Sequence, residues 1–237
     1  MKQLSTIFTF AVVLALFTAS CNNKPKAQEE TTAAVTDTAA KAKPAFKPYK
    51  AMLIIHTVAD YDKWLVGFNA HDTARKANGI SPSYVGRGID NDKLVVVYSV
   101  VTDLQKAKDF TAAPGMADVM KKAGVTGKPT MMMADIIRDD TTSIPQQERI
   151  MITHHVKDFD TWLKAYDAEG MAARSADGLV DRGMARNVDD PNTVTVLFAV
   201  TDMAKARARV ASPELKKIMT DGGVDGPPTI TWFKWQN

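Results

Sequence analysis

The chain has 237 residues, of which 45% are hydrophobic and 24% are charged, and its formal net charge is +3. This composition is that of an ordinary globular protein, and the length accommodates one large or two small domains. No basic run interleaved with aromatic residues is present, so the sequence offers no support for nucleic-acid binding.

The N-terminus has the features of an export signal. Lys2 is followed by an apolar run over residues 7–17, which is too short to cross a bilayer because a helical span takes about 20 apolar residues. Small residues then precede Cys21, the only cysteine in the chain, which therefore has no internal disulfide partner. We predict a signal peptide over residues 1–20.

The end of this segment resembles the lipobox of bacterial lipoproteins, in which the cysteine becomes the lipidated first residue of the mature chain. Ala19 and Ser20 fit that pattern, whereas Thr18 stands where Leu is usual. The resemblance implies that Cys21 is lipidated and anchors the protein to a membrane outside the cytoplasm, in the bacterial cell envelope. The alternative is an ordinary signal peptide with an incidental cysteine.

Residues 21–48 are rich in Lys, Glu, Thr, Ala, Gln and Pro and have almost no bulky apolar residue. Such a segment buries too little apolar surface to offset the entropic cost of ordering it. We therefore predict a disordered tether that ends where the folded region begins.

The folded region consists of an internal sequence repeat. The stretch HTVADYDKW from His56 to Trp64 returns as HHVKDFDTW from His154 to Trp162, and the two copies run in step for roughly ninety residues. The predicted boundaries are 49–140 for the first unit, 141–148 for a polar linker and 149–237 for the second unit.

Each copy has the pattern strand, helix, strand, strand, helix, strand. In the first copy the apolar runs predict strands near residues 52–58, 83–89, 93–101 and 129–137. In the second copy the clearest strands are expected at 151–156, 193–200 and 229–235.

The first helix of each copy is expected to begin at an aspartate N-cap, Asp60 or Asp158. In the first copy this helix is predicted to continue through Arg75, and one extra residue in the second copy predicts a bulge there. The second helix is expected to restart at Pro114 and to end near residue 124.

A β-α-β-β-α-β unit predicts a ferredoxin-like α+β fold, with a four-stranded antiparallel sheet and both helices on one face. Leu53 and Ile55 alternate with Ile54 and His56 on the first strand, so both faces of the sheet carry apolar residues. A sheet covered on one side only should have a polar open face. We therefore expect the two sheets to pack against each other.

In this element order, and in the strand–Asp–x–x–x–Trp opening, residues 51–237 resemble the dimeric α+β barrel superfamily, of which antibiotic-biosynthesis-monooxygenase-like proteins are one branch. The resemblance implies two ferredoxin-like units packed sheet to sheet, here within one chain, and a small-molecule cavity between sheet and helices. In some members a histidine shuttles a proton or ligates haem. Because fusion replaces the usual pairing of chains, we expect a monomer.

The resemblance makes His56 and His154 candidate catalytic residues that project into this cavity, since histidine changes charge near neutral pH. The alternative is a partly buried histidine bonded to a backbone carbonyl. Arg75 and Arg174 are candidates for holding a carboxylate or enolate by paired hydrogen bonds. Their alternative role is an ion pair with a nearby acid.

Arg87 and Arg186, on the second strand of each unit, have the same two interpretations. Trp64 and Trp162 are expected either to line the ligand cavity or to be core residues whose indole N–H needs a partner. No metal-binding spacing, phosphate-binding glycine loop or nucleophile elbow is present, and no motif requires a cofactor.

Three functions remain open at this stage. The first is a binding protein for a small, partly apolar molecule oriented by the histidines and arginines. The second is a cofactor-free monooxygenase or an isomerase in which histidine takes a proton and arginine stabilises an oxyanion. The third is an envelope interaction protein without a ligand.

Overall fold

The computed structural model describes residues 46–236. The predicted signal peptide, the lipidation site at Cys21 and nearly all of the predicted tether lie outside the described residues. Within this part of the chain, no helix is long and apolar enough to cross a membrane.

The elements of the two units follow one another in the same order. The first unit contains β1 (Tyr49–Val58), α1 (Tyr61–Ala70), α2 (Asp72–Ala77), β2 (Ile80–Gly88), β3 (Leu94–Val101), α3 (Leu104–Ala112), α4 (Met116–Lys122) and β4 (Val125–Asp139). The second contains β5 (Glu148–Val156), α5 (Phe159–Glu169), α6 (Met171–Ala176), β6 (Leu179–Asn187), β7 (Thr193–Val200), α7 (Met203–Val210), α8 (Pro213–Asp221) and β8 (Val224–Gln236).

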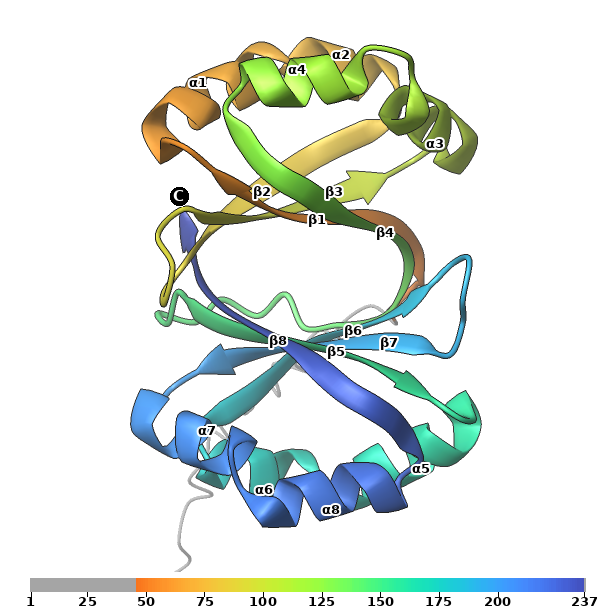
Figure 1. Cartoon of the computed structure of the whole chain (residues 1–237). Coiled ribbons are helices and arrows are strands. Elements are labelled where there is room, and N and C mark those ends of the chain that lie inside the picture. The colour runs from red at the N-terminus through yellow and green to blue at the C-terminus, as the bar shows by residue number, and fades with distance from the viewer. Residues whose placement is uncertain (1–45, 237) are drawn as a thin grey trace, which may run out of the picture. The chain divides into compact units, whose positions relative to one another are not determined.

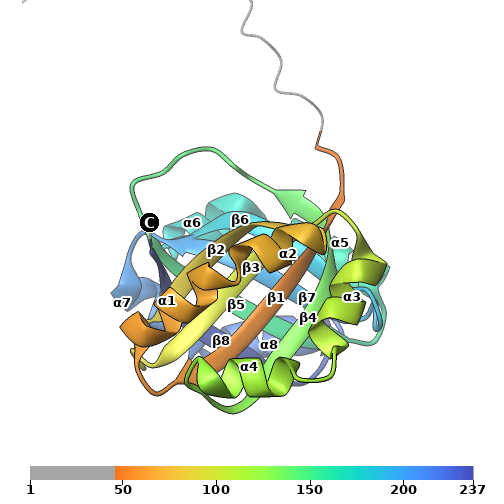
Figure 2. The same cartoon turned by 90° about the horizontal axis from the view of Figure 1, so that it is seen from above.

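All neighbouring strands are antiparallel and close into one barrel in the order β1-β3-β2-β8-β5-β7-β6-β4. Each unit supplies four adjacent strands, and the two units meet at two seams, where β2 pairs with β8 and β4 pairs with β6. The helices cover the outside of the two sheets (Figures 1 and 2). The predicted α+β fold, with two tandem ferredoxin-like units packed sheet to sheet, is confirmed.

Strand alternation gives each sheet two buried faces. On β1, Met52 and Ile54 pack in a core that includes the helix residue Trp64. Ala51 and Leu53, which alternate with these two residues along the strand, pack with residues of other strands on the inner face of the barrel. Closing the barrel therefore buries the second apolar face and leaves no exposed sheet edge.

The aspartate N-caps are confirmed, but the continuous first helix is not. The Asp60 carboxylate accepts a hydrogen bond from the Lys63 amide at 3.0 Å, and Asp158 accepts one from Thr161 at 2.8 Å. In the second unit, Gly170 has a φ of 81° and separates α5 from α6. A right-handed helix cannot pass through that backbone conformation, so the extra residue lies at a break in the helix and does not form the predicted bulge.

In the first unit the corresponding break falls at His71, between α1 and α2, so Arg75 lies on a second short helix. Pro114 also precedes its helix. Gly115, with a φ of 90°, is the N-cap, and α4 begins at Met116. β4 extends beyond the predicted strand at both ends because it pairs with β1 as far as Val125 and with β6 as far as Asp139.

The β2–β8 seam depends on a glycine. Phe233 is 1% exposed, and a Cβ atom on Gly86 would lie 2.3 Å from its Cδ2 atom. We expect Gly86→Ala to lower the free energy of unfolding by about 1–3 kcal/mol because the new methyl group would overlap the Phe233 ring and force one of them to shift. Urea denaturation measures this change.

Gly183→Ala is the matched control at the other seam. A Cβ atom on Gly183 would meet nothing closer than the Arg138 carbonyl oxygen at 3.5 Å. We expect this variant to stay within about 0.5 kcal/mol of the wild type. Equal losses in the two variants would contradict the role assigned to the contact between Gly86 and Phe233.

Candidate functional site

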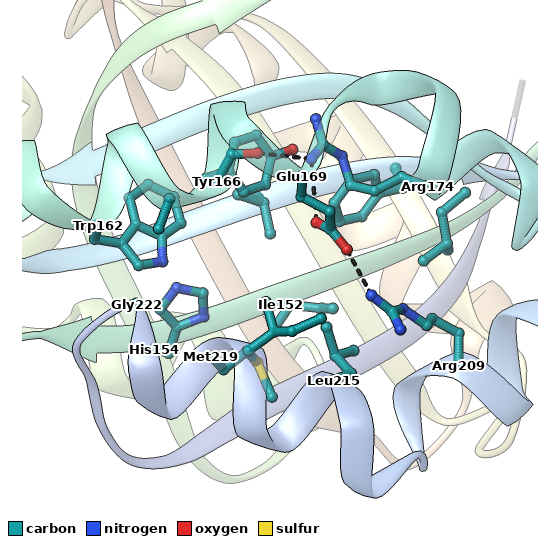
Figure 3. A pocket seen from close by; sticks show the side chains of 15 residues that line it. Ile152, His154, Trp162, Tyr166, Glu169, Arg174, Arg209, Leu215, Met219 and Gly222 are labelled. Carbon is teal, nitrogen blue, oxygen red and sulfur yellow. Dashed lines mark hydrogen bonds and ion pairs between the residues drawn. The ribbon is translucent and has the colours of Figure 1, made fainter.

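Each unit has a pocket between the outer face of its sheet and its helices. The pocket of the second unit has a volume of about 70 Å³, and that of the first unit about 100 Å³. Figure 3 shows the second pocket, where His154 and Trp162 lie at one end and Arg174 and Arg209 lie at the other. The cavity that the resemblance implied between sheet and helices is therefore present in both copies, but it is small.

His56 and His154 project from β1 and β5 toward the helices and line the two pockets. They are 9% and 6% exposed. The ring centroid of each lies 5.3 Å from that of a tryptophan on the first helix, Trp64 or Trp162. The two copies thus build the same buried pair of an imidazole and an indole.

Neither histidine has a hydrogen-bond partner among residues 46–236. In both, Nδ1 and Nε2 are buried and make no hydrogen bond to the described residues, backbone carbonyls included. Burial lowers the pKa of each imidazole from 6.5 to about 4 because the charged form loses its solvation. At neutral pH each ring is therefore uncharged, with one donor and one acceptor facing the pocket.

Arg174 is held by acidic residues. Its Nε and Nη2 atoms donate to the two carboxylate oxygens of Asp181 at 2.8 and 2.7 Å, and Nη1 lies 3.2 Å from Glu169. Burial acts to lower the pKa of Arg174, but the hydrogen bonds and charge of Asp181 outweigh it, and the pKa is raised overall. The guanidinium of Arg174 lines the pocket, but most of its N–H groups already donate to Asp181 and Glu169.

Arg75 has weaker partners. Its Nη1 donates to the Phe68 carbonyl oxygen at 2.5 Å, and Nη2 lies 3.4 Å from the carboxylate of Asp72. Nε is buried without a partner among the described residues. Burial lowers the pKa of Arg75, and Asp72 offsets this only in part. Of the two arginines, Arg75 retains more capacity to bind a polar group.

The two pockets differ at the rim. In the second unit Glu169 accepts hydrogen bonds from both Arg174 and Arg209, and the Arg209–Glu169 distance is 2.6 Å (Figure 3). In the first unit His71 and Phe110 line the corresponding side of the pocket. One pocket thus has a charged rim and the other a largely aromatic rim.

Arg87 and Arg186 line neither of these pockets. The Arg87 guanidinium stacks over Tyr61 and pairs with Asp92, whereas Arg186 stacks over Phe159 and donates to a backbone carbonyl. Trp64 and Trp162 are buried and line the pockets, so for them the core and pocket roles coincide.

The charged rim of the second pocket was not predicted. Glu169 and Arg209 are 40 residues apart, on α5 and α7, and no spacing rule pairs them. The signals available in the sequence are that Glu169 replaces His71 and that Arg209 replaces Phe110 at the repeated positions. These differences mark changes between the copies but do not show that the two residues pair.

Neither pocket fits a haem. An engineered cavity of about 150 Å³ holds benzene, and a tetrapyrrole is several times larger than benzene. Volumes of about 70 and 100 Å³ therefore leave no room for it beside either histidine. Within residues 46–236, no group of three or more His, Cys, Asp or Glu side chains is arranged to hold a metal ion.

Solved structures of low sequence identity share this fold. An anthrone oxidase-like protein aligns over 80% of this chain and 92% of its own, with 14% identity and a TM-score of 0.54. A protein provisionally described as a chlorite dismutase aligns over 80% of this chain and 95% of its own, with 12% identity and a TM-score of 0.52. A protein from Fusobacterium nucleatum that is provisionally described as a monooxygenase aligns over 80% of this chain and 93% of its own, with 9% identity and a TM-score of 0.51.

No protein-family model and no curated protein sequence matches the chain. At these identities the structural likeness shows the fold alone. This fold is the one that the resemblance to dimeric α+β barrels implied.

Proposed function

We propose that the protein binds small, largely apolar molecules carrying one hydroxyl or carbonyl group, and that each sheet–helix pocket holds the polar end of one such molecule. The observation that supports this function is that His56 and His154 are buried and have no hydrogen-bond partner in the part of the chain that the structure describes. A neutral imidazole donates to a carbonyl or accepts from a hydroxyl, so it suits either group.

The energetic argument is that unsatisfied polar groups are costly. Leaving a buried donor or acceptor without a partner costs about 1–3 kcal/mol, and both units carry the same imidazole in the same place. A bound polar group recovers part of this cost. Met116 and Met120 in the first pocket and Met219 in the second are adaptable side chains that allow a small pocket to take different shapes.

Binding is favoured over the enzymatic alternative, a cofactor-free monooxygenase or an isomerase. A general base works best with a pKa near the working pH, and a pKa of about 4 makes both imidazoles weak bases at neutral pH. In the second pocket, Arg174 is already paired with Asp181 and Glu169, which limits its use for an oxyanion. The enzyme descriptions of the structural neighbours keep this alternative as the competing outcome of the test below.

We also propose that the protein acts as a lipoprotein of the bacterial envelope, with the binding region on a tether. The support is the order of basic residue, apolar run and small residues before Cys21. The tether composition is consistent with a folded region standing away from the membrane.

2-Propanol is a suitable probe of the pockets because it has one hydroxyl group on a small apolar group and is smaller than benzene, which takes a cavity of about 150 Å³. We expect saturable binding to the full chain, with affinity falling about 2–10-fold at each pocket in His56→Phe and His154→Phe. Phenylalanine keeps the packing against tryptophan but removes both ring nitrogens. Calorimetric titration of each single variant and of the double variant measures the change.

2-Chloropropane is the matched probe because it carries chlorine in place of the hydroxyl group, and its affinity should not fall in these variants. Absence of 2-propanol binding to the wild type would favour the envelope interaction protein without a ligand. Oxygen uptake with dithranol, an anthrone, tests the enzyme alternative. Turnover that disappears in the double variant would replace the binding function with catalysis.

The buried histidines also predict a pH dependence of stability. Between pH 6.5 and about 4 the unfolded chain protonates both imidazoles while the folded protein does not. The free energy of unfolding should therefore fall as pH is lowered through this window, by on the order of 1–3 kcal/mol per histidine. The double His→Phe variant should lose less stability than the wild type between about pH 8 and about pH 5 in urea denaturation.

His71→Gln is the control for this measurement because His71 is exposed and stands outside the buried pairs. It should keep the wild-type pH profile. An unchanged profile in the double variant would show that His56 and His154 do not titrate in this way.

Lipidation is tested at Cys21. We expect the wild type to incorporate an alkyne-labelled fatty acid in a bacterial host and to partition into the detergent phase of Triton X-114. Cys21→Ser removes the only thiol and should abolish both properties. Equal labelling of the two proteins would leave an ordinary signal peptide as the explanation of the N-terminus.

A further inference from the structure

The barrel encloses a third and much larger cavity on the opposite face of the two sheets. Its volume is about 580 Å³, within the range of about 300–1,000 Å³ that is typical of small-molecule sites. Strand residues from both units line it, and the segment joining β4 to β5 borders it through Asp140, Thr142 and Gln147. We call this cavity the lumen site.

The lumen site arises from a difference between the repeats. In the first unit, Ala51 on β1 lies opposite Ala134 on β4, whereas in the second unit Arg149 on β5 lies opposite Phe233 on β8. All four residues line the cavity. Two alanines on one wall therefore leave open the space that the second unit fills with its larger side chains.

Arg149 is a buried cation that makes no ion pair with a carboxylate of residues 46–236. It is 7% exposed, and its Nη1 atom donates to the backbone carbonyls of Gln146 and Glu148 at 2.8 and 2.9 Å. Nε and Nη2 donate no hydrogen bond to the described residues, and no carboxylate among them forms an ion pair with Arg149. Burial lowers the pKa of Arg149, the neighbouring positive charge of Arg182 lowers it further, and the charge of Glu148 offsets this only in part.

The other charged groups of the cavity are already engaged. Arg182 donates to the carboxylate of Asp140 at 3.0 Å and to the Thr142 carbonyl oxygen at 2.6 Å. Asp139 accepts a hydrogen bond from the Tyr49 hydroxyl at 2.8 Å, and Tyr49 lies 2.7 Å from the hydroxyl of Tyr98. Arg138, the remaining arginine of the lining, pairs with Asp167 at 2.6 Å. Among residues 46–236, Arg149 is therefore the arginine of this cavity that makes no ion pair.

We propose that the lumen site binds an amphipathic carboxylate, with its carboxylate on Arg149 and its apolar part along the inner walls. An arginine fork pairs with a carboxylate through two parallel hydrogen bonds. The inner walls supply apolar contacts from Met132, Ala134, Ala185 and Leu197. This site is separate from the two histidine pockets because it lies on the inner face of the barrel.

Tryptophan fluorescence locates the ligand, since Trp235 lines the lumen site while Trp162 and Trp64 line the two outer pockets. The probe is bromodecanoate, whose bromine quenches tryptophan on contact, titrated into the full chain. We expect saturable quenching that is lost in Trp235→Phe and persists in Trp162→Phe and Trp64→Phe. Quenching with the reverse pattern would place the ligand in the outer pockets and overturn the proposal.

Arg149→Met tests the anchor. We expect unbrominated decanoate, measured by calorimetry, to bind at least tenfold more weakly to this variant. Arg87→Met is the control for charge, because Arg87 lines none of the three pockets and should keep wild-type affinity. Decanol and decyltrimethylammonium, which lack the carboxylate, should bind at least tenfold more weakly to the wild type.

A second variant removes the space. Ala185→Phe narrows the cavity at the β4–β6 seam and should abolish decanoate binding while thermal unfolding stays cooperative. If it does not fold, Arg149→Met and the decanol comparison decide the question. Decanol binding as tightly as decanoate, or no saturable decanoate binding to the wild type, would overturn the proposal.

Discussion

Burial of the second face of each sheet is the constraint on which this structure depends. A ferredoxin-like unit covers one sheet face with its own helices, and here the other face is apolar as well. The two units meet this requirement by pairing β2 with β8 and β4 with β6, so that every strand has two neighbours. The helix-covered pockets and the enclosed lumen both follow from that closure.

The architecture was accessible from the sequence because it is encoded in local patterns that occur twice. Element order, aspartate caps and two-sided apolar strands each predict the same arrangement, and agreement among such signals is what specifies a fold. The break at His71 was missed because the helical spacing of Trp64, Phe68, His71 and Arg75 continues across it. The extra residue at Gly170 indicates an irregularity in the second copy, but the break occurs in both copies.

The candidate site was predictable to a smaller extent. Strand alternation predicts that His56 and His154 face the helices. Their lack of hydrogen-bond partners among the described residues depends on the three-dimensional packing around them, which the sequence does not show. The engagement of Arg174 by Asp181 and Glu169 depends on how α5, α6 and β6 pack, which no spacing rule determines. Arg149 was not predicted as a site residue because a charged residue at the start of a strand is ordinary in a sequence. Its burial becomes evident only in the closed barrel.

The location of the differences between the units has a physical explanation in the fusion of the chain. In a symmetric homodimer, every residue on the inner face of the barrel occurs twice, once in each subunit. A wall with small side chains therefore cannot face a wall with large side chains at the same positions. A single chain removes this restriction, and here the inner positions carry Ala51 and Ala134 in one unit but Arg149 and Phe233 in the other. On the outer face the histidine and tryptophan pairs remain matched. A single buried arginine that makes no ion pair with the described residues, on one side of a shared cavity, is an arrangement that a duplicated chain can build and a symmetric pair of identical units cannot.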